Sequence, residues 1–149
     1  MKSGKERLVI RSLKPSEVPA MIRVWRASGL PYKPKGRDSL RNLRAQRAGD
    51  PELFIGAFIG PEMMGVILAS DDGRRAWINR LAVRPEAQRT GVASALVDRA
   101  EKVMRKRGRR LFCAQIEADN DVSTKFFEEA GYRREHGIYY FTKRELKSY

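Results

Sequence analysis

The residues from Ile78 to Ser94 constrain the fold of this chain more than any other segment. An apolar stretch ends at Arg84-Pro85, and helical spacing of apolar residues begins after Gly91. The sequence therefore predicts a strand, a turn and the start of a helix. Gly91 and Ala93 leave room for a close backbone approach, and the free amides of a helix start attract anions. This segment suits a bound pyrophosphate.

The turn itself differs from two widespread phosphate-binding patterns. A dinucleotide-binding fold would show G-x-G-x-x-G after the first strand, and a P-loop would show G-x-x-x-x-G-K-[ST]. Neither pattern occurs here, and the turn reads Gln88-x-x-Gly91-x-Ala93. Taken alone, this pattern is equally typical of a plain helix start with a small-residue packing contact.

The elements around the turn predict one mixed domain. The segments that we expect to be strands are Arg7–Ser12, Leu53–Ile59, Met64–Ser70, Arg75–Val83 and Leu111–Ala118, followed by a closing hairpin of Tyr132–Glu135 and Ile138–Lys143. The expected helices are Pro15–Ala27, one from Asp38 or Ser39 to Ala48, Val92–Arg107, and one capped by Asn120 or Asp121 that ends at Ala130–Gly131. The crossover from Val83 to Leu111 predicts one parallel strand pair. The fold class is α+β, with a mixed, mostly antiparallel sheet.

A second block of residues follows one predicted strand after the turn. It reads Asn120-x-x-Ser123-x-x-Phe126-Phe127-Glu128-x-x-Gly131-Tyr132. The turn and this block, in this order, resemble the GNAT superfamily of N-acetyltransferases. The resemblance covers about residues 7 to 143 and implies a single domain over residues 1–149, with a GNAT-like central sheet flanked by helices.

The resemblance implies acetyl-CoA as the acetyl donor. The backbone of the strand before the turn would pair with the pantetheine amides, as an added strand pairs with an open sheet edge. The amides of the turn would hold the pyrophosphate. The implied cofactor-binding residues are Leu81, Ala82, Val83, Gln88, Arg89, Thr90, Gly91, Val92, Ala93, Ser94, Asn120 and Phe127.

The proton-transfer residues are less evident. Attack requires an amine without its extra proton, and the leaving thiolate is helped by an acid. Two positions that carry these groups in many GNAT enzymes are Phe127 and Trp77 here. Glu117 and Tyr139 are the candidate catalytic residues in their place, although the first also suits a surface ion pair and the second also suits packing. A chain of water molecules is a further candidate base. Direct transfer needs no acyl-enzyme, and we expect Cys113 on a buried strand.

The acceptor side is predicted from the region around the first two helices. Trp25 and Tyr32 would form an aromatic rim, and the nearby Lys33, Lys35 and Arg37 would favour an acceptor with a carboxylate or phosphate. The same aromatic residues equally fit ordinary packing of the first helix. Asn79, just before the implied pantetheine strand, is a third candidate for acceptor binding.

The net charge of +13, from 31 basic and 18 acidic side chains, attracts anions but does not identify one. The basic residues are scattered, and Tyr139-Tyr140-Phe141 is the one aromatic cluster beside basic residues. We therefore expect no nucleic acid as main partner, and the resemblance implies an amine as the substrate. A basic nucleic-acid-binding module and a non-catalytic acyl-CoA sensor remain the alternative functions.

Several classes of protein are disfavoured by simple counts. No stretch approaches the roughly 18 apolar residues of a membrane span, so we expect no membrane partner. One cysteine and one histidine leave no internal disulfide and no zinc cage, so we expect no metal. Met1–Lys5 is charged and only Leu8–Ile10 follows as an apolar run, which predicts a cytoplasmic protein. A homodimer is compatible with the sequence.

Overall fold

The computed structural model describes residues 7–149, so Met1–Lys5 lies outside the described part. The strands of this part are β1 (Leu8–Ser12), β2 (Phe54–Ile59), β3 (Glu62–Asp71), β4 (Ala76–Val83) and β5 (Phe112–Ala114). Its α-helices are α1 (Val18–Ser28), α2 (Leu40–Gly49), α3 (Val92–Lys106) and α4 (Asp121–Glu129). No helix within residues 7–149 has the length and apolar character needed to cross a membrane.

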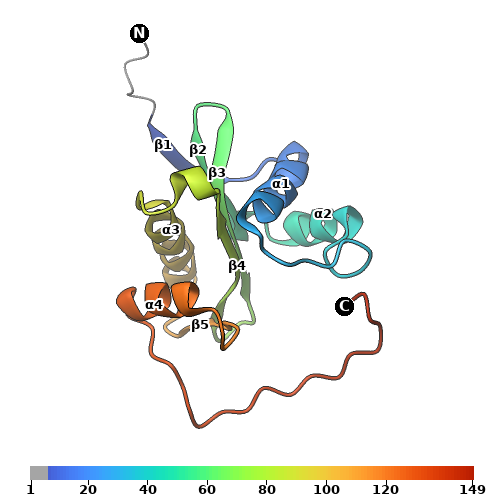
Figure 1. Cartoon of the computed structure of the whole chain (residues 1–149), viewed down its shortest axis with the longest axis vertical. Coiled ribbons are helices and arrows are strands. Elements are labelled where there is room, and N and C mark those ends of the chain that lie inside the picture. The colour runs from blue at the N-terminus through green and yellow to red at the C-terminus, as the bar shows by residue number, and fades with distance from the viewer. Residues whose placement is uncertain (1–6) are drawn as a thin grey trace.

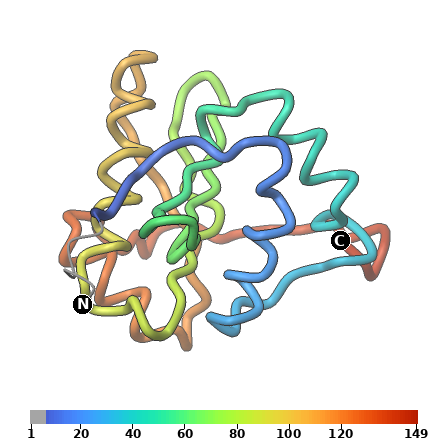
Figure 2. The backbone as a smooth tube through the Cα atoms, turned by 90° about the horizontal axis from the view of Figure 1, so that it is seen from above, coloured from blue at the N-terminus to red at the C-terminus, as the bar shows by residue number. Residues whose placement is uncertain are grey.

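The strands form one sheet in the order β1-β2-β3-β4-β5. Neighbouring strands are antiparallel except β4 and β5, which are parallel, as the crossover through α3 predicts. Helices α3 and α4 lie on one face of the sheet, and α1 and α2 lie on the other (Figures 1 and 2). The predicted fold class, a mixed and mostly antiparallel sheet flanked by helices, is confirmed.

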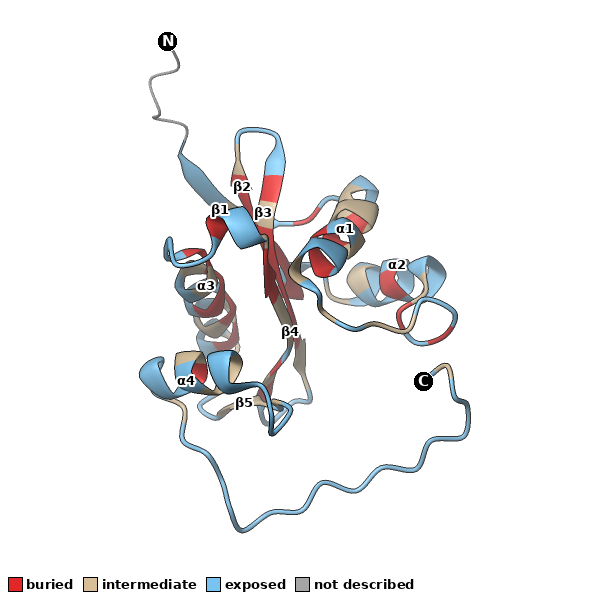
Figure 3. Ribbon diagram, in the orientation of Figure 1, coloured by how far each residue is buried: buried red, intermediate tan, exposed pale blue. Residues whose placement is uncertain are grey.

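Each face of the sheet has its own hydrophobic core, because alternate residues of the strands point to opposite faces. Ile55 and Ile67 pack with Leu96 on the α3 face, whereas Phe54 packs with Trp25 on the α1 face. Figure 3 shows buried positions on the central strands and on the helices α1 and α3 that flank them. At Gly65, a β-carbon would lie 2.9 Å from a methyl group of Val92 at the start of α3. This glycine lets α3 begin close against β3, which fixes the position of the preceding turn.

A β-bulge changes the direction of β4 just before the implied pantetheine strand. Leu68 of β3 lies opposite Arg80, whereas the next residue, Ala69, lies opposite Ile78, so Asn79 is the extra residue. A bulge bends its strand and increases the local twist. Beyond Ile78, β4 has no further pairing with β5. The prediction of a buried strand over Leu111–Ala118 is therefore wrong in length, because β5 ends where β4 turns away.

The predicted closing hairpin is also absent from the described residues. Residues 133–149 form no strand and run along an extended path away from the sheet (Figure 1). Tyr132 is held against α3 and α4, because its hydroxyl donates to the Glu101 carboxylate at 2.8 Å and its ring packs on Phe127. The chain leaves this anchor without turning back onto β5, and His136-Gly137 makes no hairpin turn.

Candidate functional site

The turn between β4 and α3 has an unusual backbone. A short 3₁₀ turn, Pro85–Ala87, follows β4, and Gly91 is the N-cap of α3. Gly91 has φ 87°, and Arg89 is a non-glycine residue with φ 63°. Left-handed values cost a non-glycine residue about 1–2 kcal/mol. Such strained residues cluster at functional sites. The conformation of Arg89 therefore makes this turn a candidate functional site.

Side chains on both sides of the turn hold it in place. The Gln88 amide donates to the Val83 carbonyl at 3.1 Å, and the Thr90 hydroxyl donates to the Ala87 carbonyl. The Arg84 guanidinium donates to the Met63 carbonyl on β3 at 2.8 Å. Gln88 and Thr90, which the resemblance places in the cofactor site, thus shape the turn through their side chains.

The backbone amides of residues 89–94 carry the main chemical signal. Within residues 7–149, none of these six N–H groups donates to a protein acceptor, and the first intrahelical bond is from Ala95 to the Gly91 carbonyl at 3.0 Å. Residues 89–91 and Ser94 are exposed, whereas Val92 is buried and Ala93 is half-buried, so the accessible part of this row is at its two ends. A helix of 15 residues adds its dipole behind them. This cradle of donors matches the needs of a pyrophosphate.

A second open feature lies beside this cradle. Strand β4 pairs with β5 only over Ala76–Ile78, so among residues 7–149 the stretch Leu81–Val83 has no strand neighbour on the β5 side. Its opposite edge pairs with Gly65, Val66 and Ile67 of β3. The free edge of β4 therefore offers unused backbone groups, which an extended ligand with amide groups can bind. We call this gap the β4–β5 opening.

On the α1 face, Arg80 links β4 to the loop between α1 and α2. Its guanidinium donates to the Pro31 carbonyl, lies 3.6 Å from the Asp38 carboxylate and stacks 4.3 Å from the centre of the Trp25 ring. Burial lowers the pKa of Arg80, and the Asp38 charge opposes that effect. The Asp38 carboxylate also accepts from the Lys33 amide at 2.8 Å. This network fixes the loop beside the implied acceptor side.

The sequence predicts Asp38 or Ser39 as the N-terminal cap of α2. The structure gives the cap to Ser39, whose hydroxyl accepts from the Asn42 amide at 3.2 Å, and leaves Asp38 almost completely buried. Two adjacent residues of cap type provided no signal to decide between them. Asp38 instead pairs with the oppositely charged Arg80, which lies on a strand 42 positions later in the chain. This distant partner leaves the cap to Ser39.

The three candidate acceptor residues lie in different surroundings. Trp25 is fully buried, so its assignment to an exposed rim is corrected: it belongs to the α1-face core. Tyr32 is half-buried, and its hydroxyl accepts from the Arg26 guanidinium at 2.8 Å. Asn79 is exposed at the bulge, and its amide donates to the Ser70 hydroxyl at 2.9 Å. Only Tyr32 and Asn79 among these three remain accessible to a ligand.

The block around α4 is mainly structural. The Asn120 side-chain oxygen accepts from the Ser123 amide at 3.0 Å and caps α4. Phe127 is buried at 6% exposure and packs edge-on against Phe126 and Tyr132, with ring centroids 5.1 Å apart in both pairs. Phe127 therefore has a core role in the fold, and its contact with the cofactor stays a prediction. The Asn120 amide nitrogen is not needed for the cap and stays a candidate cofactor contact.

The candidate catalytic side chains are not brought together. Glu117 is exposed in the loop after β5. Tyr139 lies on the extended C-terminal segment and is 86% exposed. Cys113 is half-buried on β5, and burial raises the pKa of its thiol. A protonated thiol is a poor nucleophile, which fits a mechanism without an acyl-enzyme.

Known proteins resemble this chain in sequence and in fold. An acetyltransferase of Sodalis glossinidius is 28% identical over 140 residues, which cover 93% of this chain and 96% of the relative. An acetyltransferase of Pectobacterium atrosepticum is 30% identical over 125 residues, covering 83% and 86%. The crystal structure of the PaiA N-acetyltransferase from Thermoplasma acidophilum in complex with coenzyme A matches with a TM-score of 0.77 at 23% identity, covering 87% and 91%.

A sheet that opens beside a donor-rich helix start suits an extended anionic ligand, because helix N-termini bind anions and an open strand edge binds an extended chain. The model of the acetyltransferase (GNAT) family matches residues 19–132, which include both sequence blocks. The chain belongs to the GNAT acetyltransferase family, as the resemblance implied.

Proposed function

We propose that this protein is an N-acetyltransferase that transfers the acetyl group of acetyl-CoA directly to an amine. The observation that carries the proposal is the row of six free amides at residues 89–94 next to the unpaired edge of β4. An anion cradle alone would fit many phosphate ligands. An open strand edge beside it selects a ligand that continues from the phosphates as an extended, amide-containing arm.

The free amides of the turn and the open edge of β4 support this choice of donor. The amides from Arg89 to Ser94 would hold the pyrophosphate, and the Arg89 guanidinium would add positive charge. Leu81, Ala82 and Val83 would pair with the pantetheine arm through their free edge. When bound, acetyl-CoA supplies an activated thioester. A backbone amide near Val83 would stabilise negative charge on the thioester oxygen.

The acceptor amine would approach from the α1 side of β4. The loop between α1 and α2, which Arg80 and Asp38 hold in place, would form the border of the acceptor site. Tyr32 and Asn79 would contact the acceptor. Because Phe127 is buried and Tyr139 lies on the exposed segment, we propose that water in the β4–β5 opening removes the amine proton. Glu117, the exposed carboxylate after β5, is the side chain that would assist this water.

Two measurements test the proposal in sequence. Thermal unfolding is followed with and without acetyl-CoA, and a ligand at 100 times its dissociation constant should add about 2.7 kcal/mol of stability. Thiol release from acetyl-CoA is then followed with a panel of primary amines. Amine-dependent thiol release supports transfer. Binding without release for any amine would contradict it and favour an acyl-CoA sensor.

The assignment of Glu117 has its own test. Glu117→Gln should lower the amine-dependent rate about 10-fold or more, since general base catalysis contributes 10²–10⁴-fold in total, and should leave the acetyl-CoA thermal shift unchanged. Glu135→Gln, on the exposed C-terminal segment, is the matched control for loss of one surface charge. Equal rates in the two variants would remove Glu117 from the mechanism.

A further inference from the structure

The positive charge of this chain is concentrated in α1, α2 and the loop between them. Residues 18–49, which contain these elements, hold eight basic side chains and one acidic side chain. About a fifth of the chain therefore carries more than half of its net charge of +13. Both helices lie on the face of the sheet opposite α3 and α4 (Figure 1). The charge thus belongs to the side from which the acceptor would approach.

The single acidic residue of this region leaves most of the charge without a partner. Asp38 is buried, and its carboxylate lies 3.6 Å from the Arg80 guanidinium and 3.7 Å from that of Arg37. Within residues 7–149, no other side chain of residues 18–49 takes part in an ion pair. Seven of the eight basic side chains therefore have no carboxylate partner in the described chain.

Helix α3 shows the contrast on the opposite face of the sheet. Arg105 contacts Glu101 at 2.9 Å, and the arginines that follow the helix are held by carboxylates of the same chain. Where a cation stabilises this fold, a partner is thus supplied. A group of unpaired charges of one sign instead attracts ions of the opposite sign and raises their local concentration.

Three of the basic side chains lie on the loop that borders the acceptor side. We call residues 33–37, which include Lys33, Lys35 and Arg37, the basic loop. Arg80 of β4 holds this loop from both ends, through the Pro31 carbonyl and the Asp38 carboxylate. Lys35 and Arg37 are exposed, and Lys33 is half-buried. The basic loop is therefore fixed beside β4 with its cations open to a ligand.

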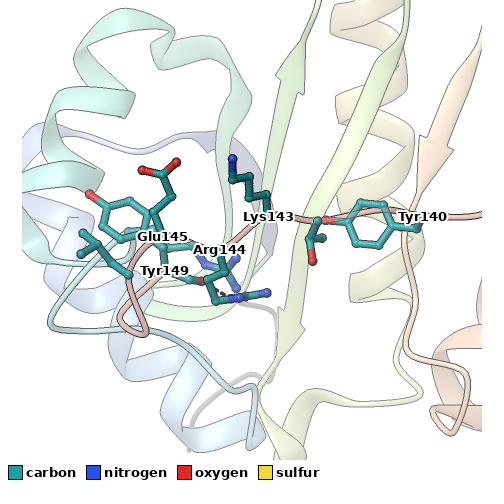
Figure 4. A pocket seen from close by; sticks show the side chains of 8 residues that line it. Tyr140, Lys143, Arg144, Glu145 and Tyr149 are labelled. Atoms are coloured by element: carbon teal, nitrogen blue, oxygen red, sulfur yellow. Dashed lines mark hydrogen bonds between the residues drawn. The ribbon is translucent and has the colours of Figure 1, made fainter.

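A hollow of about 380 Å³ lies between the basic loop and the C-terminal segment. Three of its lining side chains are basic, Arg37, Lys143 and Arg144, and one, Glu145, is acidic. Figure 4 shows Lys143 and Arg144 between Tyr140 and Tyr149 along this hollow. Sites for small ligands have volumes of roughly 300–1,000 Å³. The hollow therefore extends the positive surface and has the size for part of a small anionic ligand.

The aromatic residues of this region do not suit a single-stranded nucleic acid. Such a partner requires exposed aromatic side chains on which bases stack. The two aromatic residues of residues 18–49 are Trp25, which is fully buried, and Tyr32, which is half-buried and bonded to Arg26. The cations and the size of the hollow thus favour a small anion or an acidic peptide.

We propose that the acceptor is a small amine or a short peptide that carries at least two acidic groups, either carboxylates or phosphates. The basic loop, together with Lys143 and Arg144, binds these groups while the amine lies near β4. This assignment rests on the proposed acetyl transfer to an amine and names the class of acceptor. It excludes polycationic amines, because their charges would meet unpaired cations of the same sign.

The first test compares peptides that share one amine and differ in charge. Each begins with glycine and ends in an amide, and the next two residues are glutamate, phosphoserine, glutamine or lysine. Calorimetric titration at low salt should show at least one acidic peptide binding about 10-fold more tightly than the glutamine peptide. The difference should shrink at high salt, since exposed charges are screened. The lysine peptide should bind most weakly.

The outcomes of this comparison decide the class of acceptor. A preference for glutamate indicates carboxylates and a preference for phosphoserine indicates phosphates, and either supports the proposal. Equal binding of the acidic and glutamine peptides, or tightest binding of the lysine peptide, would overturn it. A single-stranded DNA of about eight nucleotides, within the usual size of such sites, is titrated in parallel. Tighter binding of this DNA than of both acidic peptides would also overturn the proposal, in favour of a nucleic-acid partner.

The second test asks whether the position of the charges matters. Lys35→Gln/Arg37→Gln should bring the affinities for the acidic and glutamine peptides to within about 3-fold of each other, and should leave the acetyl-CoA thermal shift unchanged. Arg99→Gln/Lys102→Gln, on exposed positions of α3, removes the same charge from the opposite face. This control should keep the preference of the unsubstituted protein. An unchanged preference in the first variant, or an equal loss in both, would contradict a role of the basic loop.

Failure of this assignment can be separated from failure of the proposed function. Peptide binding is measured with and without CoA, which carries no acetyl group, so the result does not depend on turnover. Amine-dependent thiol release without a preference for acidic peptides would overturn only the class of acceptor. A preference for acidic peptides without thiol release from any amine would contradict the proposed function instead.

Discussion

The two ends of helix α3 differ in how their polar groups are satisfied. At the N-terminal end, six successive amides have no protein acceptor in the described chain, and Arg89 adopts a left-handed conformation. At the C-terminal end, Arg107 contacts the carboxylates of Asp50, Glu52 and Asp71 at 2.7, 3.0 and 3.2 Å. Arg109 contacts Asp71 at 2.6 Å.

This difference suggests that the N-terminal end of α3 serves ligand binding and the C-terminal end serves the stability of the fold. The satisfied end ties α3 to the 3₁₀ turn before β2 and to the end of β3, and its charges are neutralised by neighbours of the same chain. The unsatisfied end leaves its donors for a ligand. Variants at the first end should therefore alter the affinity for acetyl-CoA, and variants at the second should alter the free energy of unfolding.

The largest expected effect is at Gly91. Gly91→Glu places a carboxylate against the pyrophosphate cradle and should weaken acetyl-CoA binding at least about 100-fold, or about 2.7 kcal/mol. Gly108→Glu, at the opposite end of α3, is the matched control, because it has φ 92° and an equally open surrounding. Calorimetric titration measures both. If the two variants bind acetyl-CoA equally well while folded, the ligand does not lie on this turn.

The next effect is at Arg107. Arg107→Gln leaves three carboxylates without their shared cation and should destabilise the fold by about 2 kcal/mol. The affinity for acetyl-CoA should change less than about 3-fold, within the scatter of distant sites. Urea unfolding and titration are compared on the same samples. A loss of affinity that exceeds the loss of stability would show that the two ends are not independent.

A smaller effect is expected for Arg89. Arg89→Gln removes one exposed charge and should weaken acetyl-CoA binding by about 1 kcal/mol, or about 5-fold. The weakening should disappear at high salt, where exposed charges are screened. Arg99→Gln, an exposed arginine in the middle of α3, should bind like the unsubstituted protein. Equal effects of the two substitutions would indicate net charge rather than position.

The smallest effect concerns pH. The pKa of Asp71 lies below its ordinary value of 3.8, and the hydrogen bond from Arg109 is the main cause. Burial opposes this shift, and the hydrogen bond from the Gly73 amide adds to it. A lowered pKa in the folded state adds stability above pH 3.8, and this stability is lost as the pH falls below that value. Asp71→Asn should therefore flatten the fall in unfolding free energy below pH 4. An unchanged acid limb would show that this carboxylate is not linked to folding.

Part of the fold followed from local patterns alone. Helix α3 and its glycine start were predicted because they depend on neighbours in sequence, and the parallel pair β4–β5 followed from the crossover between the two strands. The cap of α2 was narrowed only to Asp38 or Ser39. The β-bulge at Asn79 was not predicted, because it depends on the register between two strands. The pairing of Arg80 with Asp38 was missed for the same reason, since a charge on a strand gives no sign of its partner.

The candidate cofactor side depends less on tertiary structure than the catalytic side. The amides at 89–94 belong to one continuous turn, so the order of residue types is enough to propose them as donors to a pyrophosphate, and this role stays a prediction. The roles of Trp25 and Phe127 depend on burial, and both aromatic residues proved to be core residues. Glu117 and Tyr139 stay predictions, because they lie on segments whose position relative to the β4–β5 opening is set by the rest of the fold.

The segment from residue 78 to 94 was determined by sequence: a strand, a left-handed glycine and a helix start follow from local backbone preferences. Tertiary structure alone decided that β4 loses its neighbour beyond Ile78 and that residues 138–143 lie apart from β5. The physical reason is that strand pairing joins residues far apart in the chain. Its outcome depends on a bulge and on an anchor at Tyr132, which no local pattern encodes.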